Sequence, residues 1–99
     1  MKLSRTLTQA KLKHLRKLAH SKKPVILLGK AGLSESVFNE LENALSHHEL
    51  IKIKLNDSDR DNRENLIERI IQQTGAELVQ KIGQVVVIYR QSKNQVITF

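Results

Sequence analysis

The feature that most constrains the fold is the alternation of short apolar runs with longer segments of helical periodicity. The run "PVILLG" (24–29) and the alternating run "LIKIKL" (50–55) predict strands. Apolar residues spaced three and four apart predict helices over about 35–47 and 59–74. A helix that joins two strands of one sheet forms a crossover and leaves those strands parallel. The order of these segments therefore predicts parallel strands covered by helices.

The two ends of the chain complete this pattern. A basic segment behind Thr8 carries leucines at helical spacing, which predicts a first helix. Two further strands, "AELVQKI" (76–82) and "VVVIYR" (85–90), flank Gly83 and Gln84, which fit a type II′ hairpin turn. The predicted order is α-β-α-β-α-β-β, an α/β fold. Helices and a mixed sheet with an antiparallel last strand should form a small α+β two-layer sandwich, and the chain should be one domain.

The predicted strands differ in their expected burial. Four consecutive apolar residues, 25–28, predict a strand buried on both faces, and "VVVIY" predicts a central strand. In the run 50–55, Ile51, Ile53 and Leu55 should point inward while Lys52 and Lys54 point outward. The helix boundaries are predicted from N-caps at Thr8, Ser34 and Ser58 and from Gly75 behind the third helix.

Positive charge is concentrated in the first third of the chain. Residues 1–34 hold nine Lys and Arg and no acid, whereas residues 35–99 hold eight Lys and Arg and all ten acids. The net charge of +7 therefore divides into +9 and −2. A field of one sign attracts polyanions, whereas a merely solubilising surface intersperses the signs. We interpret the chain as a nucleic-acid-binding protein, and charge alone leaves RNA and DNA open.

A lysine flanked by glycines stands where the first strand passes into the second helix, in "GKAG" (Gly29, Lys30, Ala31 and Gly32). Glycine allows close backbone approach, and the first amides of a helix have no intrahelical partner. A phosphate there would meet those amides, the helix dipole and the Lys30 ammonium. The G-x-x-G loop of KH domains clamps nucleotides by the same logic, although it lies between two helices. A plain structural turn is the alternative.

Other functions find little support in the sequence. Without cysteine the chain has no disulfide or thiolate metal site, which fits a reducing compartment, and we expect a cytoplasmic protein. No stretch approaches the about 20 apolar residues of a membrane span, and no secretory signal is recognisable. Asp57, Asp59, Asp61 and Glu68 match some positions of a calcium loop, but its glycine and its first helix are missing. Nucleotide-cofactor motifs and nucleophile–base pairs are also missing, so we predict no metal, cofactor or enzyme activity.

Three stretches give the chain a specific resemblance: "LRKLAHSKKPVILLGKAGLSESV" (15–37), "HELIKIKL" (48–55) and "TGAELVQKIGQVVVIYR" (74–90). With the order of elements, they make residues 7–90 resemble the YhbY-like CRM domain, the chloroplast RNA splicing and ribosome maturation domain. The resemblance implies a four-stranded sheet in order 1-2-4-3, as in the C-terminal domain of translation initiation factor three. It leaves the tail, 91–99, unassigned.

The resemblance also implies a function. Stand-alone bacterial members are associated with precursors of the large ribosomal subunit, so we expect a monomeric, non-catalytic protein that binds rRNA in pre-50S particles. The first helix and the G-x-x-G loop should form one electropositive surface on the RNA backbone. An adaptor that docks an acidic protein is the alternative. The expected RNA-binding residues come from the loop, from the first helix with the segment after it, and from the second strand: Gly29, Lys30, Ala31 and Gly32; Lys11, Lys17, Lys22 and Lys23; and Lys52 and Lys54. For Lys52 and Lys54, the alternative interpretation is that they form the solvated face of a strand.

Overall fold

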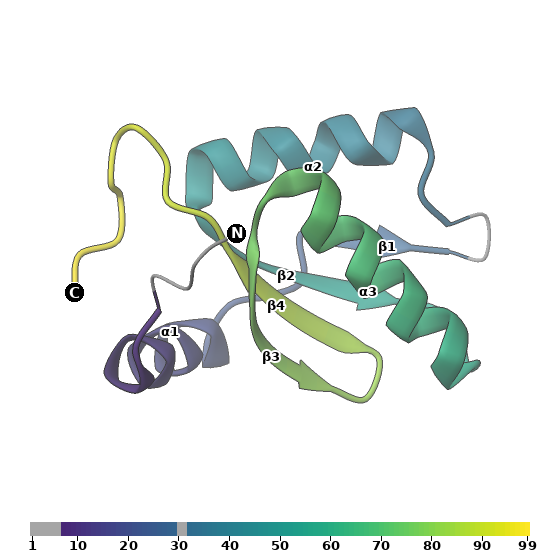
Figure 1. The fold of residues 1–99 in the computed structure, drawn as a ribbon, viewed down its shortest axis with the longest axis horizontal. Helices are drawn as coiled ribbons and strands as arrows, with labels where there is room; N and C mark the ends of the chain where they lie inside the picture. Colours follow the sequence, from purple (N-terminus) through teal and green to yellow (C-terminus); the bar gives the residue numbers. More distant parts are fainter. Residues whose placement is uncertain (1–6, 30–31) are drawn as a thin grey trace.

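The elements follow one another in the predicted order in the computed structural model of the chain, which describes residues 7–29 and 32–99 (Figure 1). These residues form the helices α1 (Gln9–His20), α2 (Glu35–His48) and α3 (Arg60–Thr74) and the strands β1 (Ile26–Leu28), β2 (Leu50–Leu55), β3 (Glu77–Ile82) and β4 (Val85–Tyr89). The sheet has the order β1-β2-β4-β3, with β1 parallel to β2 and β4 antiparallel to both of its neighbours. The predicted fold class, mixed sheet and strand order are confirmed.

The two faces of the sheet carry separate hydrophobic clusters. On one face, Leu41 and Leu45 of α2 and Ile67 and Ile70 of α3 pack against inward side chains of β1, β2 and β4. On the opposite face, α1 packs against β2, β3 and β4 through a smaller cluster. That smaller cluster consists of Leu15, Ala19, Leu50, Val79, Val87 and Tyr89. The sheet therefore forms a full sandwich with α2 and α3, and α1 covers part of its other face.

Local side-chain chemistry fixes where the helices begin. The hydroxyl of Thr8 accepts from the amide of Lys11 at 3.2 Å, as an N-cap does. The prediction for α3 was one residue off, because Asp59 rather than Ser58 is its N-cap. The Asp59 carboxylate accepts from the amides of Asp61 and Asn62, and its negative charge complements the positive end of the helix dipole better than a hydroxyl does.

The prediction that the first strand is buried on both faces was wrong. Ile26 and Leu28 are buried against α2 and α3, but Leu27 is 65% exposed and Val25, just before the strand, is 53% exposed. The cause lies in the sheet order, because β1 is an edge strand and α1 packs against strands beyond it. The open face of β1 therefore adds apolar side chains to the surface.

The C-terminal tail, which the sequence left unassigned, is fastened to the fold by Glu49. This residue follows α2 and is fully buried. Its carboxylate accepts from the amide and hydroxyl of Ser92, at 2.7 and 2.6 Å, and from the amide of Ile97 at 2.8 Å. Burial raises the pKa of this carboxyl, but these hydrogen bonds lower it by more, so the pKa lies below its ordinary value. Beyond this latch, the Phe99 ring meets the edge of Tyr89.

Candidate nucleic-acid interface

The two glycines of the G-x-x-G segment have different structural roles. Lys30 and Ala31, predicted to bind RNA, lie outside the described residues, whereas Gly29 and Gly32 lie within them. The amide of Gly32 donates to the carbonyl of Gly29 at 3.0 Å, which holds the two ends of the segment together. Gly32 has a φ of 75°, a conformation that favours glycine, and is half-buried beside Leu66. Gly29 is exposed, has no such φ and has open space around its Cα, so the fold itself does not require glycine there.

The start of α2 combines an attractive and a repulsive element for a phosphate. Ser34 is the N-cap, as predicted, and its hydroxyl accepts from the amide of Val37 at 3.2 Å. The amides of the first turn and the helix dipole give this end a positive potential. Glu35 stands in the same turn and is exposed, so its carboxylate opposes an anionic ligand. Any phosphate held here depends on cations from elsewhere.

The predicted lysines of α1 and of the segment after it have different surroundings. The ammonium of Lys11 lies 5.0 Å from the centre of the Phe99 ring, in a cation–π contact that ties α1 to the tail. Lys17 is exposed on α1, and Lys22 and Lys23 are exposed in the connection from α1 to β1. The cations most accessible to a ligand are thus at the end of α1 and just behind it.

Lys52 and Lys54 point to the face of the sheet that α1 partly covers. They alternate along β2 with Ile51, Ile53 and Leu55, which belong to the opposite core. The ammonium of Lys52 donates to the carbonyl of Lys22 at 3.0 Å, and the backbone carbonyl of Lys52 accepts from the amide of Val25 at 2.9 Å. Both bonds fasten the connection behind α1 to β2.

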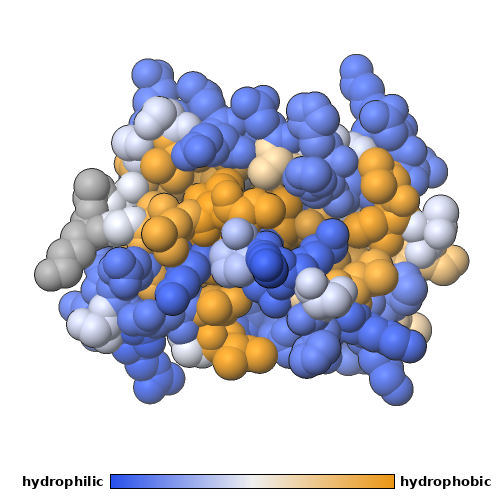
Figure 2. All heavy atoms as spheres, turned by 180° about the vertical axis from the view of Figure 1, so that it is seen from behind, coloured by the Kyte–Doolittle hydropathy of each residue, from blue (hydrophilic) through white to orange (hydrophobic). Residues whose placement is uncertain are grey.

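An open strip crosses the same face beyond α1. Lys54 is exposed and lies in register with Leu27 of β1 and Val85 of β4, and Val85 pairs in turn with Ile82 of β3. Leu27 and Ile82 are among the exposed apolar side chains of the described chain. The back of the molecule likewise shows apolar patches surrounded by hydrophilic side chains (Figure 2). This strip differs from a simple solvated strand face, because it combines a cation with apolar neighbours.

The predicted site is elongated. In Figure 1, α1 lies at the lower left and β1 points away from it, to the right, toward Gly29. The first helix and the G-x-x-G segment therefore do not form one compact patch. Between them lie Lys22, Lys23, Lys52 and Lys54, which we call the lysine row. Lys52 of this row bonds to the carbonyl of Lys22, and Lys54 lies in register with Leu27 of β1, which is two residues before Gly29.

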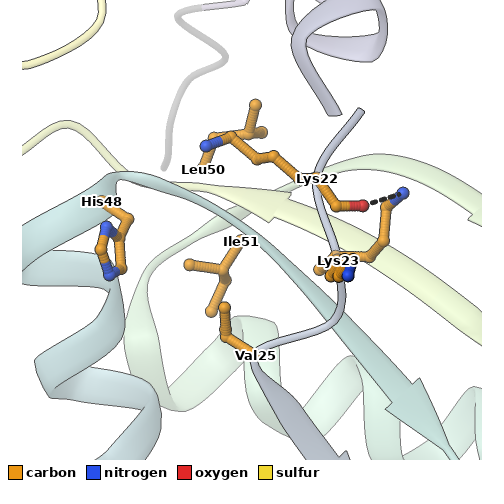
Figure 3. Close-up of a pocket in the computed structure, with 7 residues that line it drawn as sticks. Lys22, Lys23, Val25, His48, Leu50 and Ile51 are labelled. Atoms are coloured by element: carbon orange, nitrogen blue, oxygen red, sulfur yellow. Dashed lines mark hydrogen bonds between the residues drawn. The ribbon is translucent and has the colours of Figure 1, made fainter. Parts of the chain in front are cut away.

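A pocket of about 250 Å³ lies beside the lysine row at the start of β1 (Figure 3). His48 from the end of α2 forms one side, and the segment from Lys22 to Val25 forms the other. Leu50 and Ile51 of β2, both buried, lie between them. Sequence reasoning missed this pocket, because its lining comes from the segment before β1, the end of α2 and the start of β2, which are separated in the chain. The resemblance stretch "HELIKIKL" contains four of its residues and was the available signal.

Asp57 and Asp59, two of the acidic residues that resemble a calcium loop, have structural partners. Asp59 caps α3, and the Asp57 carboxylate accepts from the amide of Asp59 and the side-chain amide of Asn62. Over residues 7–29 and 32–99, no group of three or more His, Cys, Asp or Glu side chains is arranged to hold a metal ion. In the same part of the chain, no helix combines the length and apolar character needed to cross a membrane.

Comparison with known proteins identifies the family. The family model of the CRS1/YhbY (CRM) domain matches residues 7–90. The chain is 46% identical over 88 residues to a protein of Haemophilus influenzae named "RNA-binding protein", with 89% of each chain covered. It is 42% identical over 86 residues to a "probable RNA-binding protein" of Pseudomonas aeruginosa, with 87% of this chain and 83% of the relative covered. The solution structure of a hypothetical protein from Staphylococcus aureus superimposes with a TM-score of 0.76 at 38% identity, over 89% of this chain and 92% of that one. The chain belongs to the CRS1/YhbY (CRM) domain family.

Proposed function

We propose that this protein binds RNA and assists assembly of the large ribosomal subunit, by holding the rRNA of precursor particles through its phosphate backbone. The observation that carries the proposal is the lysine row. Its cations extend from the end of α1 to the strand that leads into Gly29. Relatives named RNA-binding proteins support RNA as the ligand. The pre-50S particle as the site of action comes from the family resemblance.

The proposed mode of binding relies on charge and shape. Phosphates contact the exposed lysines, while the G-x-x-G segment lets the RNA backbone approach the positive end of α2. A sheet that stacks several bases, as in RRM domains, requires exposed aromatic side chains, and this chain has only three aromatic residues. Of these, Tyr89 is buried and Phe38 packs against the core. In this proposal the protein acts by binding and orienting RNA, without catalysing a reaction.

Salt dependence is the first test. If about five phosphates are neutralised, the logarithm of the association constant should fall against the logarithm of salt with a slope of about −3.5 for single-stranded RNA. Fluorescence anisotropy with a labelled RNA at several potassium chloride concentrations measures this slope. An affinity that does not change with salt would contradict a backbone-binding mode.

A charge reversal tests the G-x-x-G segment. Lys30→Glu should weaken RNA binding without changing the unfolding temperature, because a lysine beside the RNA is replaced by a repelling carboxylate. Lys93→Glu is the matched control, since it changes the net charge equally on the exposed tail. Equal losses in both variants would attribute the effect to overall charge and remove the segment from the site.

The biological setting is tested in cell extract. Sedimentation on a sucrose gradient should recover the protein with precursors of the large subunit, and RNA crosslinks should map to Lys22, Lys23 and Lys30. Crosslinks to protein alone would favour the adaptor that docks an acidic partner.

A further inference from the structure

The pocket beside the lysine row has a lining that backbone binding does not explain. Phosphate contacts need cations and amides, whereas this lining includes Val25, an apolar side chain that is 53% exposed, together with the buried side chains of Leu50 and Ile51. His48 is exposed and faces Ile51 and Val25 across the pocket (Figure 3). An imidazole opposite the exposed Val25 side chain provides two surfaces between which a flat ring can lie.

The cations around the pocket point to the chemistry of its ligand. Lys22 stretches across the opening toward Leu50, and Lys23 follows it in the connection to β1 (Figure 3). A ligand with one flat apolar part and one anionic part is complementary to this arrangement. Unstacked RNA nucleotides have this composition, and proteins hold such bases against His and other ring side chains.

We propose that this pocket holds one unstacked nucleotide of a single-stranded RNA segment. The base lies between His48 and Val25, and its phosphate contacts Lys22 and Lys23. At about 250 Å³ the pocket is smaller than the about 300–1,000 Å³ of sites for drug-sized ligands, which fits one base. The inference deepens the proposed RNA-binding function, because it adds a base contact to a backbone-binding surface.

The backbone around the pocket is held in place from β2. The Lys52 ammonium binds the carbonyl of Lys22, and the Lys52 carbonyl binds the amide of Val25. These two bonds fix the wall that carries Lys22 and Lys23. The pocket lies at the start of β1, and the G-x-x-G segment lies at its end, about 13 Å further along four residues of extended chain. One RNA strand that follows the β1 edge can therefore occupy both sites.

The test uses the full-length protein and a ten-nucleotide single-stranded RNA that carries one 4-thiouridine, whose base crosslinks to side chains in contact with it. Crosslinked peptides, mapped by mass spectrometry, should contain residues 22–25 or 48–52. Affinity is measured in parallel by fluorescence anisotropy. His48→Ala should weaken binding about 5- to 10-fold, as expected for the loss of one base-stacking contact. His48→Phe, which keeps a ring, should restore most of that affinity.

His47→Ala is the matched control, because His47 is exposed and its ring nitrogen contacts the carbonyl of Asn43, away from the pocket lining. It should bind RNA as the wild type does. If RNA binds but His48→Ala and His47→Ala have wild-type affinity, or crosslinks fall only on other segments, the nucleotide pocket is refuted and the proposed function stands. If the wild type binds no RNA, the proposed function fails as well. Unfolding temperatures of the variants verify that each one is folded.

Discussion

The two faces of the sheet are built from the same strands but differ in how completely helices cover them. Along β2, Ile51, Ile53 and Leu55 enter the core beneath α2 and α3, while Lys52 and Lys54 point to the face that α1 only partly covers. The first face is closed by two helices, and the second keeps an open strip of cations and apolar side chains. A period of two in one strand thus separates Ile51, Ile53 and Leu55, which belong to the core, from Lys52 and Lys54, which we propose to contact RNA.

The largest expected effect lies on the closed face. Ile53→Ala should lower the free energy of unfolding by about 2–5 kcal/mol, because it leaves a cavity where a fully buried side chain packs. Lys54→Ala, the adjacent residue on the open face, should change it by no more than about 0.5 kcal/mol. Urea denaturation of both variants measures the contrast. Similar losses of unfolding free energy in the two variants would contradict the view that only the closed face stabilises the fold.

The tail latch should be the next most sensitive feature. Glu49→Ala removes the acceptor of three hydrogen bonds and should cost about 1–3 kcal/mol of unfolding free energy. Glu40→Ala, at an exposed position of α2, is the control and should be near neutral. Thermal unfolding distinguishes the two. A Glu49→Ala variant as stable as its control would show that the hydrogen bonds from Glu49 to the tail contribute nothing to stability.

The same latch should depend on pH. Because the pKa of folded Glu49 lies below its ordinary value of 4.5, the carboxylate stabilises the fold fully above about pH 4.5. This contribution should be lost as the pH falls through the folded pKa. The difference in unfolding free energy between the wild type and Glu49→Gln, measured from pH 7 to pH 3, should therefore shrink at the acidic end. A constant difference over this range would rule out the carboxylate as the source.

The two glycines of the G-x-x-G segment extend the comparison to a loop. Gly32→Ala should destabilise the fold by about 1–2 kcal/mol, because its φ of 75° is costly for a residue with a Cβ. Gly29→Ala has room for its methyl group and should leave stability nearly unchanged. Denaturation measures the first effect, and RNA affinity of Gly29→Val tests close backbone approach at the second. If Gly29→Val binds RNA normally, glycine at this position is needed neither for stability nor for close approach of the RNA backbone.

Smaller effects are expected on RNA binding from single charges. Lys54→Ala should reduce the salt slope by about 0.7 and the affinity about fourfold at 0.15 M salt, the effect of one lost phosphate contact. Glu35→Gln should raise affinity about twofold, because it removes a carboxylate from the positive end of α2. Anisotropy titrations over a salt series measure both, with Lys93→Ala as the control for the first. A wild-type slope in Lys54→Ala would remove that residue from the interface.

Features set by neighbouring residues could be predicted from the sequence. The alternation in 50–55, the caps at Thr8 and Ser34 and the glycine at position 75 depend on interactions within a few residues, and the structure agrees with each. The N-cap of α3 is Asp59 and not the predicted Ser58, because these two residues are adjacent and both can cap a helix. Rules based on neighbouring residues do not decide which of two adjacent capping residues begins the helix.

Features set by the arrangement of whole elements could not be predicted in this way. Four apolar residues at 25–28 look alike in an edge and in a central strand, and only the placement of α1 leaves Leu27 exposed. The tail latch joins Glu49 to residues more than 40 positions later. The pocket brings His48, the last residue of α2, to Lys22, which precedes β1. In each case nothing in the local sequence identifies the partner.

The unpaired edge of β1 affects whether lysine variants of this protein associate with one another in solution. An unpaired edge strand with an outward leucine is a template for strand addition by another copy of the chain. Lysines beside such an edge keep copies apart by repulsion, so the cations proposed to attract RNA also guard against self-association. Variants that neutralise several of these lysines should therefore self-associate more readily as well as bind RNA more weakly. Light scattering measures the first effect, and binding curves measure the second.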